Sequence, residues 1–173
     1  MEALKSKIRS VPDFPKAGIL FYDITTLLRD REGFHMTIDA LAQPFEGKGI
    51  DVVVGVESRG FIIGGAVADR ISAGFAPVRK KGKLPAKTVQ ETYDLEYGTD
   101  CLEIHSDAVD PGQRVLIVDD VLATGGTAAA TTALVRKLGG QVHALAFLVE
   151  LEFLNGRSKI PQETIFSVLK YSA

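Results

Sequence analysis

The segment from Val115 to Ala128 constrains the fold of this chain more than any other part of the sequence. It reads VLIVDDVLATGGTA: an apolar run, two adjacent aspartates, and a loop of small residues that opens a helical pattern. A β-branched apolar run is typical of a strand covered on both faces. Glycines between a strand and a helix are typical of a phosphate-binding turn. We therefore predict a strand, an acidic pair at its carboxyl end and a phosphate cradle, a combination that suits a phosphorylated sugar with free hydroxyls.

Strand and helix patterns alternate between positions 51 and 149, which predicts an α/β fold with an open, mainly parallel sheet and helices on both faces. Ligands of such sheets bind beyond the carboxyl ends of the strands, where the loops after Val56 and Val118 are expected. The patterns predict helices at 2–9, 32–45, 61–72 and 128–138, strands at 51–56, 74–79, 114–118, 142–149 and 164–169, a hairpin or edge ribbon at 88–97 and 101–105, an irregular segment at 11–18, and a loop or short strand at 19–28.

Length and composition fit one globular domain spanning residues 1–173, because 46% of the residues are apolar and 24% are charged. The net charge of −2 argues against general affinity for nucleic acid. A local basic cluster favours a small polyanionic ligand, although a solvated surface loop is the common alternative for such a run. The cluster consists of Arg79, Lys80, Lys81, Lys83 and Lys87.

Cellular location and redox state follow from what the chain lacks. Its one cysteine, Cys101, excludes an internal disulfide and is expected to be a buried structural thiol. The first residues show no apolar core of a secretion signal, and no apolar run has the length of a membrane span. We therefore expect a cytoplasmic protein with no membrane partner. The three histidines, at 35, 105 and 143, lack the spacing of metal ligands.

The loop of Ala123, Thr124, Gly125, Gly126 and Thr127 has the features that phosphate binding requires. Glycine lets the backbone approach an anion, the start of a helix leaves N–H groups free, and the threonine hydroxyls add donors. The alternative is an ordinary Gly-Gly turn before a helix capped by Thr127. Two other phosphate motifs are excluded: Phe61 stands where a P-loop needs lysine, and no G-x-G-x-x-G follows a strand.

Asp119 and Asp120 favour a functional reading of that loop. Adjacent carboxylates at a strand end cost repulsion and desolvation free energy unless they have a task. They could hold vicinal hydroxyls, or bind Mg²⁺ through water. The alternative is a pair of solvated loop acids.

Four segments in order resemble the type I phosphoribosyltransferases, and more specifically the adenine phosphoribosyltransferase family, over nearly the whole chain. They are VPDFPKAGILFYDITTLL, VGVESRGFIIGGAVA, RKKGKLPAKTVQETYDLEYGTD and GQRVLIVDDVLATGGT, with a later LVEL. The resemblance implies the type I phosphoribosyltransferase fold, with residues 1–30 as a small N-terminal hood and 79–100 as a mobile catalytic loop.

The resemblance also implies a reaction of purine salvage, in which adenine and phosphoribosyl pyrophosphate give AMP and pyrophosphate. Residues 123–127 would hold the 5-phosphate. Asp119 and Asp120 would hold the ribose hydroxyls and stabilise the cationic sugar. The implied cofactor is Mg²⁺, held through substrate and water with no direct protein ligand.

For the pyrophosphate, the resemblance implies contacts from Arg59, with backbone amides near Glu57 to Gly60 and a cis peptide in that loop. Arg79, Lys80 and Lys83 would be further pyrophosphate ligands. Arg79 would reach across a subunit interface, which implies a homodimer. The alternative for Arg59 is a surface arginine at a helix start, an unfavourable position for a cation unless an anion is present.

For the base, the resemblance implies that Glu96 acts as an acid or base near the purine and that Tyr97 helps to close a lid. Phe21 would stack on adenine, and backbone groups of Leu20 and Tyr22 would read its edge. An exposed ribbon and a core phenylalanine are the alternatives. Tyr22 stands where many relatives carry arginine, so the hood residues are the weakest part of the resemblance.

Two other functions stay open at this point. The same chemistry could serve another base, such as xanthine. The chain could also be a non-catalytic regulator that senses phosphoribosyl pyrophosphate on the same fold. The partners expected from the resemblance are adenine, phosphoribosyl pyrophosphate and AMP, and no nucleic acid.

Overall fold

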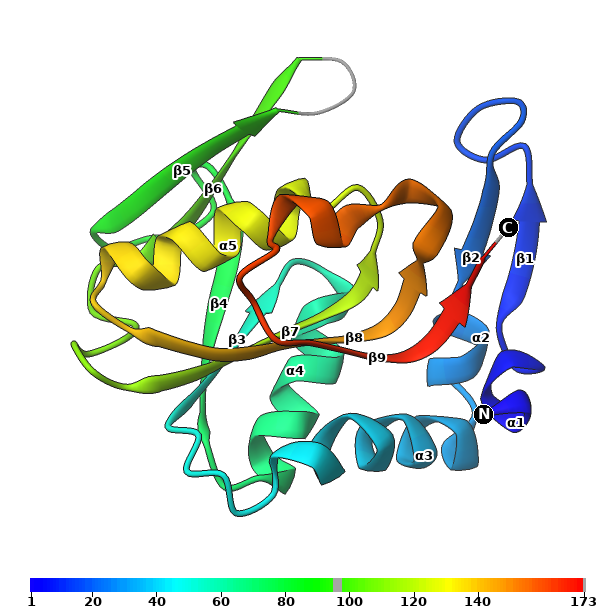
Figure 1. Ribbon diagram of the computed structural model, residues 1–173, viewed down its shortest axis with the longest axis horizontal. Coiled ribbons are helices and arrows are strands. Elements are labelled where there is room, and N and C mark those ends of the chain that lie inside the picture. Colours follow the sequence, from blue (N-terminus) through cyan, green and yellow to red (C-terminus); the bar gives the residue numbers. More distant parts are fainter. Residues whose placement is uncertain (95–97, 173) are drawn as a thin grey trace.

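The computed structural model describes residues 1–94 and 98–172 and shows an α/β fold with a small separate hairpin (Figure 1). The helices are α1 (Glu2–Lys5), α2 (Thr25–Leu28), α3 (Arg31–Ala42), α4 (Arg59–Arg70) and α5 (Gly126–Lys137), and the 3-10 helices are η1 (Gln43–Phe45), η2 (Glu152–Leu154) and η3 (Gly156–Lys159). The strands are β1 (Arg9–Pro12), β2 (Leu20–Asp23), β3 (Val52–Val56), β4 (Gly74–Lys80), β5 (Thr88–Asp94), β6 (Thr99–His105), β7 (Arg114–Leu122), β8 (Gln141–Leu151) and β9 (Ile165–Tyr171).

The main sheet confirms the expected open, mainly parallel architecture. Within the described residues its strand order is β5-β6-β4-β3-β7-β8-β9. Five strands, β4, β3, β7, β8 and β9, run parallel to one another. Strands β5 and β6 form an antiparallel hairpin that joins β4 at the edge, as the alternating pattern predicts. β7 is the middle strand of the parallel part.

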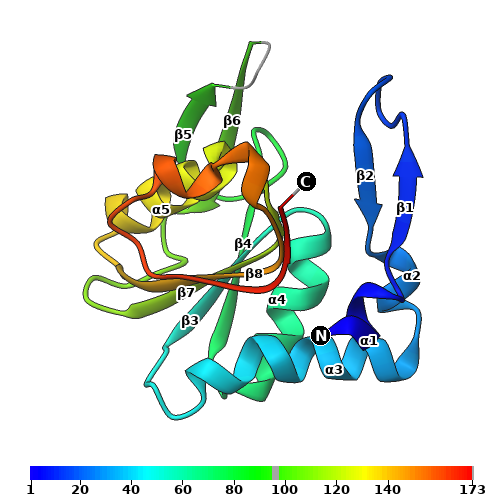
Figure 2. The same ribbon diagram turned by 45° about the vertical axis from the view of Figure 1, so that its right-hand side comes forward.

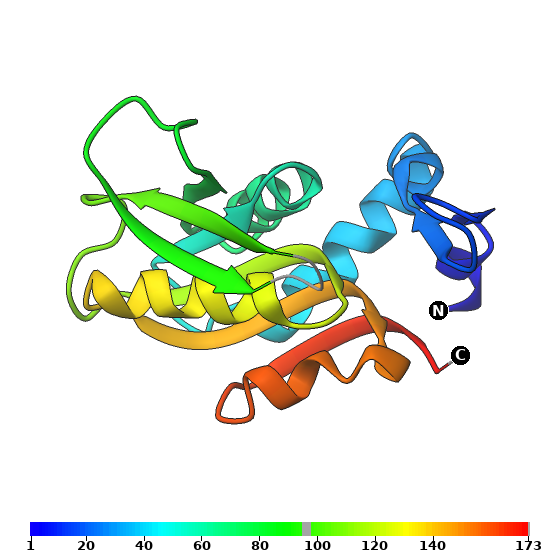
Figure 3. The ribbon, with the colours of Figure 1, turned by 90° about the horizontal axis from the view of Figure 1, so that it is seen from above.

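Side chains alternate between the two faces of the sheet, and each face has its own helical cover (Figures 1 and 3). Leu116 and Val118 of β7 point into the core that α3 and α4 close, whereas Val115 and Ile117 point into the core beneath α5. Because both faces are buried, these strands read as continuous apolar runs. The prediction of helices on both faces is therefore confirmed.

The chain leaves β3 and β7 in opposite directions along the sheet. β3 leads through α4 to β4 on one side, and β7 leads through α5 to β8 on the other. Since β3 and β7 are direct neighbours, a crevice opens between the loops that follow them. Such a switch point is where open parallel sheets bind ligands.

Three boundaries near this crevice differ from the prediction. Helix α4 begins at Arg59 rather than at Phe61. Strand β7 continues to Leu122 rather than ending at Val118, because its pairing with β8 persists to the Leu122–Glu150 register. Asp119 and Asp120 therefore lie inside strand β7, near its carboxyl end, instead of in a loop. Helix α5 begins at Gly126, two residues before the predicted start, because the loop is tighter than the pattern suggested.

The N-terminal region departs most from the prediction. The helix expected at 2–9 ends at Lys5, and the chain then forms the antiparallel β1–β2 hairpin. A cross-strand ion pair closes it, with Arg9 Nη2 2.5 Å from Asp23 Oδ2. Proline and residues with positive φ between the two strands interrupt the alternation of apolar and polar residues. A short stretch of sequence therefore does not reveal that the two strands pair.

The hairpin stands to one side of the body (Figure 2), and a ring contact links it to β9. The rings of Tyr22 and Tyr171 lie 4.0 Å apart. The division into a hood at 1–30 and a mobile loop at 79–100 stays a prediction. Among the described residues, no helix combines the length and apolarity needed to cross a membrane.

Packing against α5 predicts a large stability effect at one leucine. Leu134 is fully buried between α5 and the sheet. Leu134→Ala should lower the free energy of unfolding by about 2–5 kcal/mol, because it removes buried carbon and leaves a cavity. Urea denaturation followed by circular dichroism measures this change.

Leu154→Ala is the matched control, because that side chain is 38% exposed. It should change stability by less than about 0.5 kcal/mol. Equal effects at the two leucines would contradict the described packing.

Candidate functional site

A cleft of about 480 Å³ lies where the crevice between β3 and β7 opens. It brings together nine of the residues predicted for the site: Arg59, Lys80, Asp119, Asp120, Ala123, Thr124, Gly125, Gly126 and Thr127. The remaining lining residues are Val56, Glu57, Ser58, Val121, Leu122, Ala128 and Phe147. Residues that are far apart in the chain thus meet in one concave surface at the carboxyl ends of the strands.

The loop at 123–127 presents free backbone donors to this cleft. Gly125 has a φ of +82° and precedes α5, whose first residue is Gly126. No side chain caps the helix, and within the described part of the chain no group accepts a hydrogen bond from the amides of 126–128. Aligned free N–H groups and the positive end of the helix dipole make this turn suitable for an anion. The alternative in which Thr127 caps α5 is wrong.

Close backbone contact with a second segment fixes the shape of the loop. A Cβ added to Gly125 would lie 2.3 Å from the carbonyl oxygen of Gly156. On its other side, Gly126 packs against the ring of Tyr93, where an added Cβ would come within 3.1 Å of the ring. Glycine is therefore required at 125 by its left-handed φ and by the lack of space.

The two aspartates line the cleft but are largely removed from solvent, at 9% exposure for Asp119 and 8% for Asp120. The Asp119 carboxylate accepts a hydrogen bond from the Asp120 backbone N–H at 2.9 Å. Burial raises the pKa of Asp119 well above its ordinary value, and the charge of Asp120 raises it further. Gly60 allows this burial, because an added Cβ there would lie 2.7 Å from Asp119 Oδ1.

Arg59 connects the two motif loops. It is the first residue of α4, and its guanidinium donates to the Asp120 carboxylate. Its Cζ also lies 5.8 Å from the centroid of the Phe21 ring. The peptide between Glu57 and Ser58 is cis, as the resemblance implies. Arg59 thus offers a cation at the cleft wall, at a helix start where an anion would be favourable.

Not every residue of the basic cluster lines the cleft. Lys80 lines the cleft, and its Nζ lies 3.1 Å from Asp100 Oδ2. Arg79 Nη2 lies 3.2 Å from Glu57 Oε2, and its Nη1 donates to the carbonyl of Lys83 at 3.3 Å. Neither Arg79 nor Lys83 is among the described residues that line the cleft.

The residues predicted for the base are not part of the cleft lining in the described chain. Leu20, Phe21 and Tyr22 lie on β2 of the hairpin, and Phe21 approaches the cleft only through Arg59. Glu96 and Tyr97 lie outside the described residues. The roles of all five stay predictions.

Two residues of the β5–β6 hairpin, Tyr93 and Asp100, contact residues that line the cleft, and the sequence reasoning missed them. Tyr93 packs on Gly126, and its hydroxyl lies 3.5 Å from both Thr127 Oγ1 and Asp100 Oδ2. Strand alternation could have found Tyr93, because Val89, Glu91 and Tyr93 share the face turned toward α5. Burial raises the pKa of the Tyr93 hydroxyl, so it stays a neutral donor.

For a metal ion, the cleft offers the two adjacent carboxylates of Asp119 and Asp120, whereas the carboxylate of Glu57, which also lines it, pairs with Arg79. No group of three or more His, Cys, Asp or Glu side chains forms a metal cage within residues 1–94 and 98–172. Oxygen ligands suit Mg²⁺, which tolerates few protein ligands when substrate and water supply the others. The residues present therefore fit Mg²⁺ held mainly through substrate.

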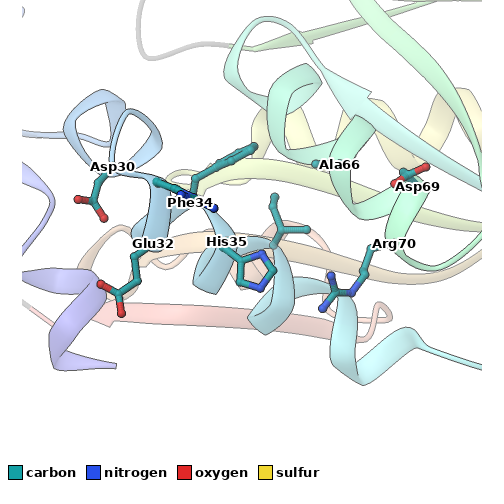
Figure 4. Close-up of a pocket in the computed structure, with 9 residues that line it drawn as sticks. Asp30, Glu32, Phe34, His35, Ala66, Asp69 and Arg70 are labelled. Atoms are coloured by element: carbon teal, nitrogen blue, oxygen red, sulfur yellow. The ribbon is translucent and has the colours of Figure 1, made fainter.

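A second depression, of about 710 Å³, lies between α3 and α4 (Figure 4). Two of its charged side chains form ion pairs: Asp30 with Lys7 at 2.7 Å, and Arg70 with Asp39. It contains no residue of the predicted site. It is also far in sequence from the acidic pair and the phosphate loop, so we do not assign the chemistry to it.

Comparison with known proteins agrees with the geometry of the cleft. Residues 25–170 match the model of the phosphoribosyl transferase domain. An adenine phosphoribosyltransferase of Acidobacterium capsulatum is 64% identical over 99% of this chain and 94% of its own length.

Solved structures agree as well. The adenine phosphoribosyltransferase of Rhodothermus marinus has 55% identity and a TM-score of 0.94, covering 98% of this chain and 97% of that one. The enzyme of Saccharomyces cerevisiae, solved with an imino-altritol bisphosphate and adenine, has 43% identity and a TM-score of 0.92, with 97% of each chain covered. This chain therefore belongs to the phosphoribosyltransferase family, and within it to the adenine phosphoribosyltransferases.

Proposed function

We propose that this chain converts adenine and 5-phosphoribosyl 1-pyrophosphate to AMP and pyrophosphate. One observation carries the proposal: a helix start with free amides and a buried acidic pair share a single cleft. The first suits a phosphate and the second suits the hydroxyls of a sugar. The high identity to adenine phosphoribosyltransferases supports the choice of adenine as the base.

In this mechanism the loop at 123–127 anchors the donor by its 5-phosphate. The amides of 126–128 and the hydroxyls of Thr124 and Thr127 donate to the phosphate oxygens. Because the loop is rigidly packed on Gly156 and Tyr93, it holds the ribose without rearrangement. Because the phosphoribosyl donor is held in one orientation, less entropy is lost when adenine reacts with it, and the activation free energy is lower.

The pyrophosphate leaves from the anomeric carbon toward the cationic wall of the cleft. The cations Arg59 and Lys80 would neutralise the negative charge of the leaving pyrophosphate. Arg79 and Lys83 would add positive charge at the edge of the cleft. When bound, Mg²⁺ would supply further positive charge to the pyrophosphate oxygens. Charge placed in advance where the leaving group develops is an effective means of catalysis.

Positive charge develops on the ribose ring as the pyrophosphate leaves. Asp119 and Asp120 would hold the ring hydroxyls and stabilise that charge at close range. Since Asp120 pairs with Arg59, a bound pyrophosphate that engages Arg59 would free the Asp120 carboxylate for the sugar. Two carboxylates in a site of low exposure act strongly on a nearby cation.

Adenine would enter between the cleft and the β1–β2 hairpin, with Phe21 stacking on the ring and the backbone of Leu20 and Tyr22 reading its edge. Glu96 would exchange a proton with the purine, and Tyr97 would help to exclude water. The position of Phe21 beside Arg59 supports this route.

Assembly and location are further parts of the proposal. We expect a cytoplasmic homodimer, in which the partner covers the exposed Ile62 and Phe75. Light scattering that gave only the 18.6 kDa mass of one chain would contradict the dimer.

Base competition tests the function most simply. With phosphoribosyl pyrophosphate and Mg²⁺, adenine should release pyrophosphate at least about 100-fold more efficiently than guanine, hypoxanthine or xanthine, because an edge read by hydrogen bonds rejects the wrong base strongly. Chelation of Mg²⁺ should abolish the release. Preference for xanthine, or donor binding without turnover of any base, would instead support one of the two alternatives.

Gly125→Ala tests the phosphate loop. The methyl group would meet the Gly156 carbonyl at a left-handed φ, so the loop must shift. We expect kcat/KM to fall about 100-fold, since a displacement of about 1 Å has that effect on positioned substrates.

Gly112→Ala is its control, because Gly112 has a similar φ of +86° and open space around it. It should leave kcat/KM unchanged and affect only stability. An equal loss of activity in both variants would show that backbone strain, rather than loop position, is responsible.

Asp119→Asn should raise the stability of the fold and lower the activity. The raised pKa of Asp119 means that folding stability is lost as the pH rises through the folded-state value, so the charged form costs stability at neutral pH. The amide keeps the acceptor for the Asp120 N–H and removes that cost. The Tm should rise by about 2–4 °C at pH 7.5, the shift expected for roughly 1 kcal/mol.

The gain should shrink as the pH falls toward the ordinary aspartate value of 3.8. Activity at pH 7.5 should drop about 100-fold, because charge stabilisation in the transition state is lost. Calorimetric scans across pH, together with steady-state rates, check both effects. A lower Tm with full activity would overturn this role for Asp119.

A further inference from the structure

The segment that follows β8 forms the underside of the phosphate loop. A Cβ added to Gly156 would lie 2.3 Å from the carbonyl oxygen of Ala123, 3.1 Å from the Gly125 nitrogen and 3.1 Å from Leu122 Cδ1. The two backbones therefore touch with no room for a methyl group on either side. Any displacement of Gly156 toward the loop must displace the loop.

This contact is steric. Among the described residues, no backbone hydrogen bond joins the loop at 123–127 to Gly156. The distance between the two backbones must therefore be fixed by whatever holds Gly156 in place. Asn155, with a φ of +50°, turns the chain into η3 just before it.

The next residue supplies the anchor. Arg157 Nε lies 2.6 Å from Glu150 Oε1, and Arg157 Nη2 lies 2.7 Å from Glu150 Oε2, which is a bidentate pair. Arg157 Nη1 also donates to the Ile165 carbonyl at 3.4 Å. A planar fork on a carboxylate fixes orientation as well as distance.

Glu150 belongs to the rigid part of the molecule. It is 4% exposed, lies in β8, and stands in register with Leu122, the residue just before the loop. Its pairing with Arg157 lowers the pKa of the Glu150 carboxyl, so it stays charged at neutral pH. The path from sheet to loop is thus short: Glu150, Arg157, Gly156, and then Ala123 and Gly125.

We propose that Glu150 and Arg157 are positioning residues, which set the shape of the phosphate loop by holding Gly156 against it. Neither side chain lines the cleft, so neither touches substrate. Their effect is confined to ligands that carry the 5-phosphate, a specificity that rests on the role of the loop in the proposed function.

The chain contains a matched control pair. Arg136 Nη2 lies 2.5 Å from Glu163 Oε1, and the side-chain exposures are 53% and 5%, against 41% and 5% for Arg157 and Glu150. Arg136 lies near the far end of α5, and within the described part of the chain it forms no hydrogen bond or ion pair with residues 123–127. Loss of this pair removes a similar ion pair without moving the loop.

The test compares Glu150→Gln, Arg157→Lys and Glu163→Gln as full-length proteins. Calorimetry measures the Kd of ribose 5-phosphate, AMP and inorganic pyrophosphate, and steady-state rates give KM and kcat. Glu150→Gln should weaken the binding of ribose 5-phosphate and of AMP about tenfold, and it should raise the KM of phosphoribosyl pyrophosphate by the same factor. The reason is that Gly156 would no longer hold the phosphate loop in its binding conformation. The Kd of pyrophosphate, the KM of adenine and kcat at saturating donor should stay within about twofold.

Arg157→Lys keeps the positive charge and one hydrogen-bond donor. Its affinity for ribose 5-phosphate and AMP should therefore fall about threefold, which lies between wild type and Glu150→Gln. Glu163→Gln should match wild type for every ligand, with a comparable fall in Tm. Equal weakening of pyrophosphate and AMP in Glu150→Gln, or the same pattern in Glu163→Gln, would overturn the positioning role. If the wild-type protein does not transfer the phosphoribosyl group to adenine, the proposed function is wrong. The Kd of ribose 5-phosphate would still decide the role of Glu150 in that case.

Discussion

The site depends on one topological constraint: β3 and β7 are neighbours, while the helices that follow them cover opposite faces of the sheet. Their connecting loops must then diverge, and a cleft opens between them. The first loop brings Arg59 and the second brings residues 123–127. The residues of these two loops that we propose for binding a charged ligand are therefore held by strands and helix starts with buried cores on both sides, which limits their movement.

Electrostatic strain is concentrated in this cleft. Asp119 is buried beside a second carboxylate, Asp120 is held by Arg59, and the amides that begin α5 have no acceptor among the residues that the structure describes. The buried carboxylate and the amides without acceptors cost free energy in the unliganded chain, and a sugar phosphate bound as proposed would offset that cost. In the proposed function, the arrangement therefore exchanges folding stability for affinity toward one kind of ligand, as active sites commonly do.

Much of this was predictable from the chain. The apolar runs at 52–56 and 114–118, with glycine-rich turns after them, determine a parallel sheet and place two loops at one edge. The β1–β2 hairpin was not predictable, because cross-strand pairing around a proline-containing turn leaves no local period. Nor could a short window reveal that Gly156 supports Gly125, since the contact joins backbones thirty-one positions apart and depends on how β8 ends.

The central claim is that residues 123–127 receive the phosphate of the sugar. The most direct measurement is a crystal structure with AMP bound. The account predicts that the 5-phosphate oxygens lie within hydrogen-bond distance, about 2.7–3.2 Å, of the amides at the start of α5, with the ribose hydroxyls on Asp119 and Asp120. A phosphate bound instead to the lysines at 80–87, with the loop at 123–127 free of ligand, would contradict it.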